Sequence, residues 1–275
     1  MLRNLMKQDS EVIGMKQDTD IRQAQMRLLE MLISFDRICK KNKIDYFISG
    51  GTCLGAVRHG GFIPWDDDLD VDIMYKDMKK LTRVLAKELP SQYFLQTPKS
   101  DKGYYHIFPR IVDKNSRMHY PARYNARSNL KYHGLFLDVF PLQWHIMPDV
   151  KRTVDRWFVT ILRFSREIGG TPLKRNIAKM LLPLAWLFIK GLNMVSSFKI
   201  WDFLNDQHVS HMYGTNINPC VKYSNVFPTQ PIKFEGHSFS GPAKPHEYLT
   251  DLFGDYMEVP PPEKRITHSI KIEVF

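Results

Sequence analysis

Cysteine is scarce in this chain of 275 residues, which contains only Cys39, Cys53 and Cys220, widely spaced and without a CxxC pair. This spacing favours neither a disulfide framework nor a cysteine-based zinc site, and it fits a reducing compartment. The first 20 residues mix Lys, Gln and Asp and lack the apolar core of a secretory signal peptide. We therefore expect a protein that stays in the cytoplasm.

Acidic residues are also in the minority, since 29 Asp and Glu stand against 39 Lys and Arg and leave a net charge of +10. Such a charge predicts anionic partners, whether nucleotides, nucleic acid, anionic polymers or an anionic membrane surface. A hydrophobic content of 43% and a charged content of 25% are typical of a globular protein. The length allows one sizeable core, or one domain with a large insertion.

Long uninterrupted apolar runs are missing as well. Between Met180 and Phe198 the only charge is Lys190, but Pro183 and Gly191 interrupt a segment that would need about 20 apolar residues to span a bilayer. The surrounding region 151–199 combines large apolar residues with ten Lys or Arg residues against two acidic ones. This composition indicates either a helical element at a membrane surface or a helical subdomain with a solvated basic face.

Carboxylates concentrate in one place, the segment Asp66–Ile73. Alternation from Asp68 onward puts Asp68, Asp70 and Asp72 on one face of a strand and apolar residues on the other. Crowded like charges are costly unless a cation neutralises them, and hard oxygen ligands suit Mg²⁺ or Mn²⁺. A calcium loop is disfavoured, because its glycine and closing glutamate are missing. The segment therefore predicts a divalent-metal phosphate site.

Gly50-Gly51 precede this segment and follow a short apolar run. Glycines there let backbone N–H groups approach a phosphate, and a helix that starts at this point favours negative charge at its N-terminus. Arg58 and His59 follow and could clamp phosphate oxygens. As isolated residues they would more often be structural.

A second lone carboxylate, Asp138, lies within the apolar run Gly134–Pro141. Because an unpaired buried carboxylate is expensive, Asp138 either binds metal or is hydrogen-bonded. It could supply a third metal ligand or a general base. An aromatic wall for a quaternary ammonium group is a further, weaker hypothesis, and its candidates are Tyr104, Tyr105, Tyr120, Tyr124 and Trp144.

Periodicity and breakers predict the order of the remaining elements. A helix is expected from Thr19 to about Lys41, and a second from Asp77 to Leu89. Residues 113–133 are expected to form a substrate-facing loop. The other expected elements are strands at 45–49, 93–96, 104–108, 110–112 and 134–141, a hairpin at 232–239 and a helix at 246–253.

The long segment Gly50–Asp70 resembles the signature of the LicD family, bacterial phosphocholine transferases related to the fukutin-type ribitol-phosphate transferases of animals. Three further segments resemble the family in order, namely 35–40, 136–142 and 253–268. Cys53 is a departure, since an apolar residue is usual there, and a small thiol should be tolerated.

The resemblance implies an α+β fold with a nucleotidyltransferase-like mixed sheet flanked by helices and a helical basic insertion. It implies a polar leader at 1–18, a catalytic core at 19–144, the insertion at 145–215 and a C-terminal segment at 216–275. Asp68, Asp70 and Asp138 match the metal ligands of the family, with Asp66 close by. The residues expected to face the nucleotide phosphates are Gly50, Gly51, Thr52, Arg58 and His59.

The reaction that this resemblance implies is metal-dependent transfer of a phospho-alcohol, most often phosphocholine, from a CDP-linked donor to a sugar hydroxyl, with release of CMP. The expected acceptor is a cell-surface glycan, a teichoic acid precursor or a lipid-linked polymer, and no nucleic-acid partner is expected. Localisation would be cytoplasmic and peripheral at the inner membrane face. Two alternatives remain: a nucleotidyltransferase that releases pyrophosphate, and a non-catalytic module that binds anionic polymers or membranes.

Overall fold

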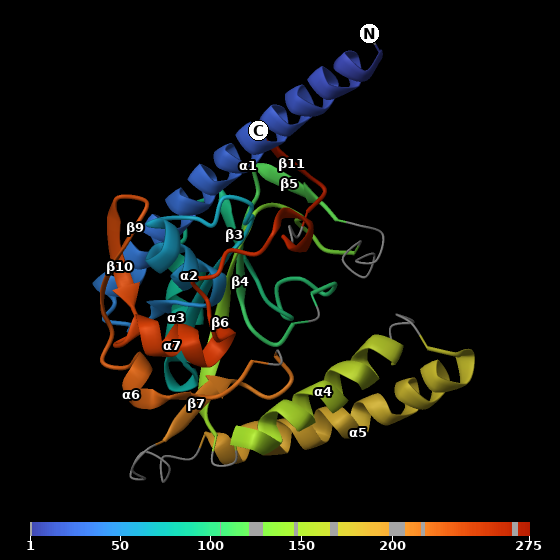
Figure 1. Cartoon of the computed structure of the whole chain (residues 1–275). Helices are drawn as coiled ribbons and strands as arrows, with labels where there is room; N and C mark the ends of the chain where they lie inside the picture. Colours follow the sequence, from blue (N-terminus) through green and yellow to red (C-terminus); the bar gives the residue numbers. More distant parts are fainter. Residues whose placement is uncertain are drawn as a thin grey trace.

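A mixed seven-stranded sheet forms the centre of the computed structural model (Figure 1). The structure describes residues 2–104, 106–120, 129–145, 148–165, 170–197, 207–215, 218–265 and 269–275. The sheet order is β1-β2-β6-β4-β3, with β7 added to β6 and β8 to β7. Only β2 and β6 pair in parallel; the other neighbours in this sheet are antiparallel. The strands are β1 (Phe47–Ile48), β2 (Leu69–Met74), β3 (Tyr93–Gln96), β4 (Arg110–Asp113), β6 (Phe136–Trp144), β7 (His208–His211) and β8 (Val221–Lys222).

Two small sheets and the helices surround this centre. The strands β9 (Gln230–Phe234) and β10 (His237–Gly241) form a hairpin, and β5 (Ser116–His119) pairs with β11 (Lys271–Val274) near the C-terminus. The helices are α1 (Leu2–Lys41), α2 (Gly50–His59), α3 (Tyr75–Glu88), α4 (Pro148–Ser165), α5 (Pro172–Ser196), α6 (Tyr223–Val226), α7 (Pro245–Phe253) and the 3₁₀ helix η3 (Pro262–Lys264).

The alternation of β2 separates its two faces as the sequence predicts. Leu69, Val71 and Ile73 are fully buried and join the main core beneath α1 and α3. A second apolar cluster includes Cys53 from α2 and Leu249 from α7. The three cysteines of the chain are free, as their spacing indicates, and the thiol of Cys53 is accommodated without exposure.

Several expected elements are confirmed, with boundaries that shift by a few residues. The hairpin turns at Glu235-Gly236, α3 starts two residues before Asp77, and the 151–199 region forms two helices, α4 and α5. Strand β6 extends beyond Pro141 to Trp144, because its last three residues pair with β7.

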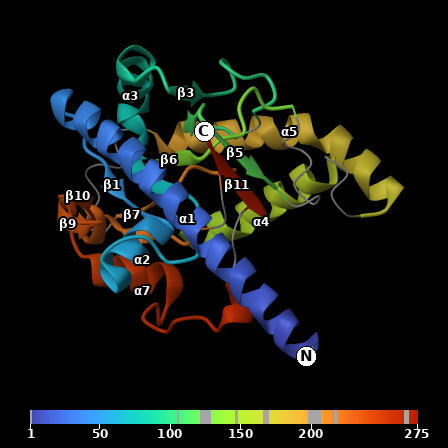
Figure 2. The same ribbon diagram turned by 90° about the horizontal axis from the view of Figure 1, so that it is seen from above.

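Three expectations about local structure were wrong. Helix α1 begins at Leu2 rather than near Thr19, because no proline interrupts its first half, and this half projects from the body of the molecule in both views (Figures 1 and 2). The described part of 104–108 is not a strand, since Tyr104 closes a turn by bonding to the carbonyl of Asp101. The 113–133 region contains β5, which pairs with the chain's last strand.

Helices α4 and α5 lie side by side at one end of the molecule (Figures 1 and 2). They share a small core of their own, with Phe158 and Ile189 fully buried. Much of the outer surface of α5 is apolar and exposed, through Leu173, Met180, Leu184, Leu187, Phe188 and Met194. Among the described helices, α5 alone has the length and composition to cross a membrane, and 22% of its most apolar window is buried.

Candidate active site

Three neighbouring strands bring Asp70, Asp138 and Arg110 into one row across the sheet. Asp70 on β2 is paired with Asp138 on β6 in parallel register, and Asp138 is paired with Arg110 on β4 in antiparallel register. Partners in register point their side chains to the same face of a sheet. Two carboxylates that lie 68 residues apart in the sequence therefore become neighbours on the face opposite to the main core.

Asp138 is held by Arg110 through two hydrogen bonds. The Arg110 Nε and Nη2 atoms donate to Oδ1 and Oδ2 at 2.5 and 2.8 Å, and both side chains are buried. Burial alone would lower the pKa of Arg110, but the charge of Asp138 outweighs it and raises the pKa above its ordinary value. Of the two roles expected for Asp138, metal ligand or hydrogen-bonded residue, the structure shows the second.

Asp70 lies in the most crowded electrostatic position of the site. Burial raises its pKa well above the usual range, and the charges of Asp68, Asp138 and Asp66 raise it further. Since the neighbouring carboxylates disfavour ionisation of Asp70, a cation placed beside it would be strongly stabilised. The expected acidic cluster thus forms around Asp70.

The two glycines that start α2 let this helix approach the carboxylates. Gly50 has φ of +50°, and a Cβ atom there would lie 2.9 Å from Asp70 Oδ2. A Cβ atom on Gly51 would lie 3.1 Å from Asp66 Oδ2. Any side chain at Gly50 would need a strained backbone and a displaced carboxylate. The N-terminal end of α2, where backbone N–H groups favour negative charge, therefore faces the acidic cluster.

Thr52, in the first turn of α2, ties the helix to β2, because its Oγ1 accepts a hydrogen bond from the Asp70 backbone N–H at 2.8 Å. This contact fixes the position of Asp70 relative to the helix N-terminus. A direct role of Thr52 toward a nucleotide stays a prediction.

Asp72 is not directed to metal or solvent. Its carboxylate accepts hydrogen bonds from Ser49 Oγ at 2.6 Å and from His211 Nε2 at 2.9 Å. The imidazole of His211 in turn stacks on Phe140, with ring centroids 4.4 Å apart. Asp72 therefore links β2 to the N-cap of α2 and to β7, and it supports the acidic cluster from one side.

The carboxylate of Asp67 is bonded to the C-terminal segment. The backbone N–H and the hydroxyl of Ser269 both donate to its carboxylate, at 2.9 and 2.5 Å. The neighbouring loop is held from the other side by Gln25 of α1, whose Nε2 donates to the Ile63 and Asp66 carbonyls at 3.1 and 3.0 Å. Contacts from both ends of the chain thus fix the acidic loop.

Arg58 and His59 lie in the last turn of α2, about 12 Å along the helix from Gly50. Arg58 Nη1 donates to the carbonyls of Tyr256 and Glu258 at 2.8 and 3.2 Å. These bonds hold the C-terminal segment against α2. The structure therefore places Arg58 away from Gly50 and Gly51, and the role of Arg58 and His59 as phosphate ligands stays a prediction.

Carboxylate oxygens are suitable ligands for a hard divalent cation, but the described side chains are not arranged as a complete metal site. The described residues contain no group of three His, Cys, Asp or Glu side chains placed to hold a metal ion. Both oxygens of Asp138 are bonded to Arg110, and metal ligation by Asp68, Asp70 and Asp138 stays a prediction. Asp68 and Asp70 are the pair from which a metal site can be built, with substrate phosphate as the remaining ligand.

Among the described residues, the expected aromatic wall does not form as a unit. Tyr120 packs at the main core, whereas Trp144 packs on Tyr223 beside the second cluster. Tyr105 and Tyr124 lie outside the described residues, as does His268 of the C-terminal motif. Tyr120 and Trp144 are separated because they belong to different elements, the end of β5 and the end of β6.

Sequence reasoning missed Arg110, His211 and Ser49, the partners of the two buried carboxylates. One signal was available for Arg110, which is a lone cation next to the apolar pair Ile111-Val112, as Asp138 is a lone anion in an apolar run. Buried opposite charges on two strands favour pairing of those strands. His211 and Ser49 carry no comparable signal.

Comparison with known proteins agrees with this geometry. The family model described as "LicD/FKTN/FKRP, nucleotidyltransferase domain" matches residues 43–159, which include the acidic cluster and its neighbouring strands. The lipopolysaccharide cholinephosphotransferase LicD of Haemophilus influenzae is 27% identical over 91% of this chain and 96% of its own length.

Two eukaryotic proteins match shorter segments. Human ribitol 5-phosphate transferase FKRP is 40% identical over 48 residues, which are 18% of this chain and 10% of the relative. Mannosyltransferase regulator 4 of Saccharomyces cerevisiae is 25% identical over 126 residues, or 44% of this chain and 10% of the relative.

Proposed function

We propose, on the premise that residues 43–159 belong to the LicD/FKTN/FKRP nucleotidyltransferase-domain family, that this chain is a phosphotransferase for substituted phosphate groups. It transfers a phospho-alcohol, most readily phosphocholine, from a CDP-linked donor to a sugar hydroxyl of a cell-surface glycan, and it releases CMP. A bacterial relative that aligns over 96% of its length is named as a lipopolysaccharide cholinephosphotransferase.

One observation supports this proposal most strongly, the acidic cluster at the N-terminus of α2. The Gly50 and Gly51 positions allow no side chain without displacing Asp70 or Asp66, so the helix end and the carboxylates form a narrow site with both anions and N–H donors. Such a site suits a diphosphate together with a divalent cation. Asp68 and Asp70 would hold Mg²⁺ or Mn²⁺, which when bound neutralises charge on the diphosphate and on the departing CMP.

The residues of the chain have separate tasks in the transfer. Backbone N–H groups at the start of α2 orient the donor phosphates, and Thr52 holds Asp70 in place. The acceptor hydroxyl oxygen attacks the phosphorus that carries the alcohol, and the bond from that phosphorus to the CMP oxygen breaks. The hydroxyl proton passes to Asp138 or Asp66, and the Asp138–Arg110 pair holds β6 against β4.

Membrane contact completes the proposal, because a glycan acceptor attached to lipid is found at a membrane. The exposed apolar residues of α5 lie beside basic residues such as Arg175 and Lys190. This combination suits an element that lies in the headgroup region of an anionic membrane. We place the protein in the cytoplasm, at the inner face of the membrane.

The enzymatic proposal is tested by measuring products from purified protein with Mg²⁺, an acceptor glycan and either CDP-choline, CDP-ribitol or CDP-glycerol. We expect CMP release with one donor, loss of release on chelation, and loss in Asp68→Asn. If none of the three donors yields CMP, the proposal is wrong. Release of pyrophosphate from a nucleoside triphosphate would indicate a nucleotidyltransferase instead.

Membrane contact is tested separately by sedimentation with liposomes that contain anionic phospholipid. We expect binding that weakens as salt rises, because screening reduces the attraction between the basic residues and the lipid. Replacing Leu184 and Leu187 by Ser should weaken binding by about tenfold or more, since each exposed Leu buries apolar surface worth about 1.5 kcal/mol or more. Unchanged binding of this variant would contradict the role of α5.

A further inference from the structure

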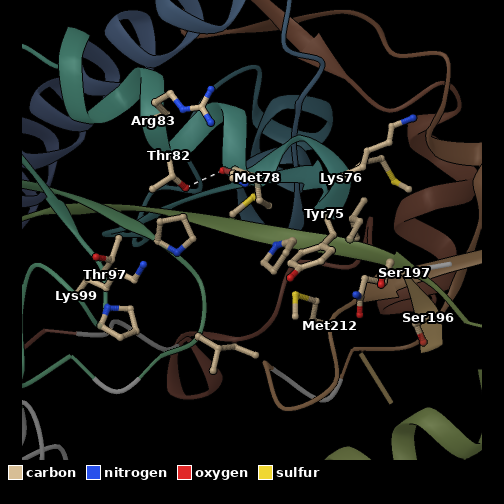
Figure 3. A pocket seen from close by; sticks show the side chains of 18 of the residues that line it. Tyr75, Lys76, Met78, Thr82, Arg83, Thr97, Lys99, Ser196, Ser197 and Met212 are labelled. Atoms are coloured by element: carbon tan, nitrogen blue, oxygen red, sulfur yellow. Dashed lines mark hydrogen bonds between the residues drawn. The ribbon is translucent and has the colours of Figure 1, made fainter. Parts of the chain in front are cut away.

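A pocket of about 950 Å³ lies at the far end of β2 and β6, apart from the acidic cluster (Figure 3). Met74 on β2 and Pro141 on β6 line it, four and three residues beyond Asp70 and Asp138, which corresponds to about 10–13 Å along the strands. None of the residues of the acidic cluster lines it. Its size falls in the range of ligand-binding pockets.

The inner surface of this pocket is mostly apolar. The residues that line it come from six separate segments, and the apolar ones include Met74, Met78, Ile107, Pro109, Pro141, Leu142, Trp144 and Met212. Such a surface offers room for a hydrocarbon chain and gains free energy when the chain leaves water.

The charged residues that line the pocket are all positive. Lys76, Lys79 and Arg83 follow at three- and four-residue spacing on one face of α3, and Lys99 comes from the loop after β3. No Asp or Glu is among the residues that line the pocket. Within the part of the chain that the structure describes, none of these four cations makes an ion pair or a side-chain hydrogen bond. All four are therefore available to an anionic group.

The wall of the pocket also includes Ser196 and Ser197, at the end of α5 (Figure 3). The exposed apolar surface of α5, with Leu187 and Met194, leads along the helix toward this end. A helix at a membrane surface would thus bring the pocket close to lipid. The continuity of the two features favours a lipid over a water-soluble ligand.

We propose that the pocket binds one hydrocarbon chain of a phosphate-bearing lipid, with the phosphate held by the cations on α3 and Lys99. Apolar lining selects the chain, and four cations without a nearby lining acid select the negative headgroup. This inference goes beyond the transferase activity and does not depend on it, because it concerns binding alone.

The test is calorimetric titration of the full chain with lysophosphatidic acid below its micelle concentration. We expect binding that Lys79→Glu with Arg83→Glu weakens by at least about tenfold, whereas Lys87→Glu, on the same helix outside the pocket, changes it less than twofold. Lysophosphatidylcholine with the same chain should bind at least about tenfold more weakly, and glycerol 3-phosphate should not bind at millimolar concentration.

Equal binding of the two lysolipids, or binding unaffected by the charge reversal, would overturn the proposal. A variant with Leu184→Ser and Leu187→Ser should bind lysophosphatidic acid normally; if it does not, the lipid binds to the α5 surface and the pocket assignment is wrong. Should the double charge reversal unfold the protein, Lys79→Gln with Arg83→Gln, which adds no negative charge, must still weaken binding measurably.

Discussion

The acidic cluster and the α4–α5 pair are stabilised in opposite ways. Three carboxylates in and around the cluster have partners from other parts of the chain: Asp138 is bonded to β4, Asp72 to Ser49 and β7, and Asp67 to the C-terminal segment. The α4–α5 pair has a small core of its own and leaves most of α5 exposed. The rest of the fold thus holds the site in place, whereas the outer surface of the α4–α5 pair is suited to contact with a membrane or another molecule.

The difference shows where function and stability can be separated. In the cluster, charge repulsion around Asp70 lowers the free energy of unfolding, and such a loss of stability is typical of functional sites. On α5 the cost is exposure of apolar surface, which is typical of interaction surfaces. The following changes would break or sharpen this comparison.

The largest effect is expected for Asp70→Asn, measured as CMP release. Activity should fall by at least about 10³-fold, because a carboxylate proposed to hold the metal is lost. The free energy of unfolding should stay equal or rise, since the variant removes repulsion from Asp66, Asp68 and Asp138. Asp77→Asn, on the first turn of α3, serves as the matched control and should keep activity. A marked loss of stability in Asp70→Asn would contradict the assignment of repulsion at this position.

Arg110→Met should destabilise the protein by about 3 kcal/mol or more, because it leaves the Asp138 carboxylate buried and unpaired. Urea unfolding measures this loss. The double variant with Asp138→Leu should recover much of it, since no buried charge remains. Simple additivity of the two changes would show that the ion pair does not couple β4 to β6.

Two changes within α5 separate its inner and outer faces. Ile189→Ala removes a fully buried side chain and should cost about 2–4 kcal/mol in the local stability of the pair. Leu187→Ala, at a side chain that is 69% exposed, should cost less than about 0.5 kcal/mol. Hydrogen exchange of the α4 and α5 amides measures both. Equal costs would mean that the outer face of α5 packs against protein.

A small effect is also expected at Glu235, which joins the hairpin to α1. Arg22 donates to both of its oxygens at 2.8 and 2.7 Å, and this contact lowers the pKa of Glu235. A lowered carboxyl pKa contributes stability above the unfolded pKa of about 4.3 and loses it as the pH falls through the folded pKa. Glu235→Gln should therefore cost about 1 kcal/mol at pH 7, because the pair is partly exposed.

Urea unfolding at pH 7 and at pH 3 tests this linkage. The difference between the native chain and the variant should shrink as the pH falls toward and through the lowered pKa of Glu235, because protonation of the carboxyl removes the partner of the Arg22 charge. An equal difference at both pH values would show that Glu235 acts through its shape rather than its charge.

The amino-acid sequence by itself determined the local elements and the chemistry of the site. Strand alternation placed Asp70 opposite the core, Gly50-Gly51 predicted a close approach, and the basic apolar composition of 151–199 indicated a helical region. These features depend on short-range periodicity and backbone sterics, which can be followed along the chain.

Only the tertiary structure decided which side chains meet. In the folded chain Asp138 is bonded to Arg110, and Asp72 is bonded to Ser49 and His211. Arg58 lies in the last turn of α2 and is bonded to the C-terminal segment. It also formed the pocket beside α3 from segments far apart in the sequence. The physical reason is that strand order and register set these contacts. A register shift of one residue would turn every side chain of a strand to the opposite face.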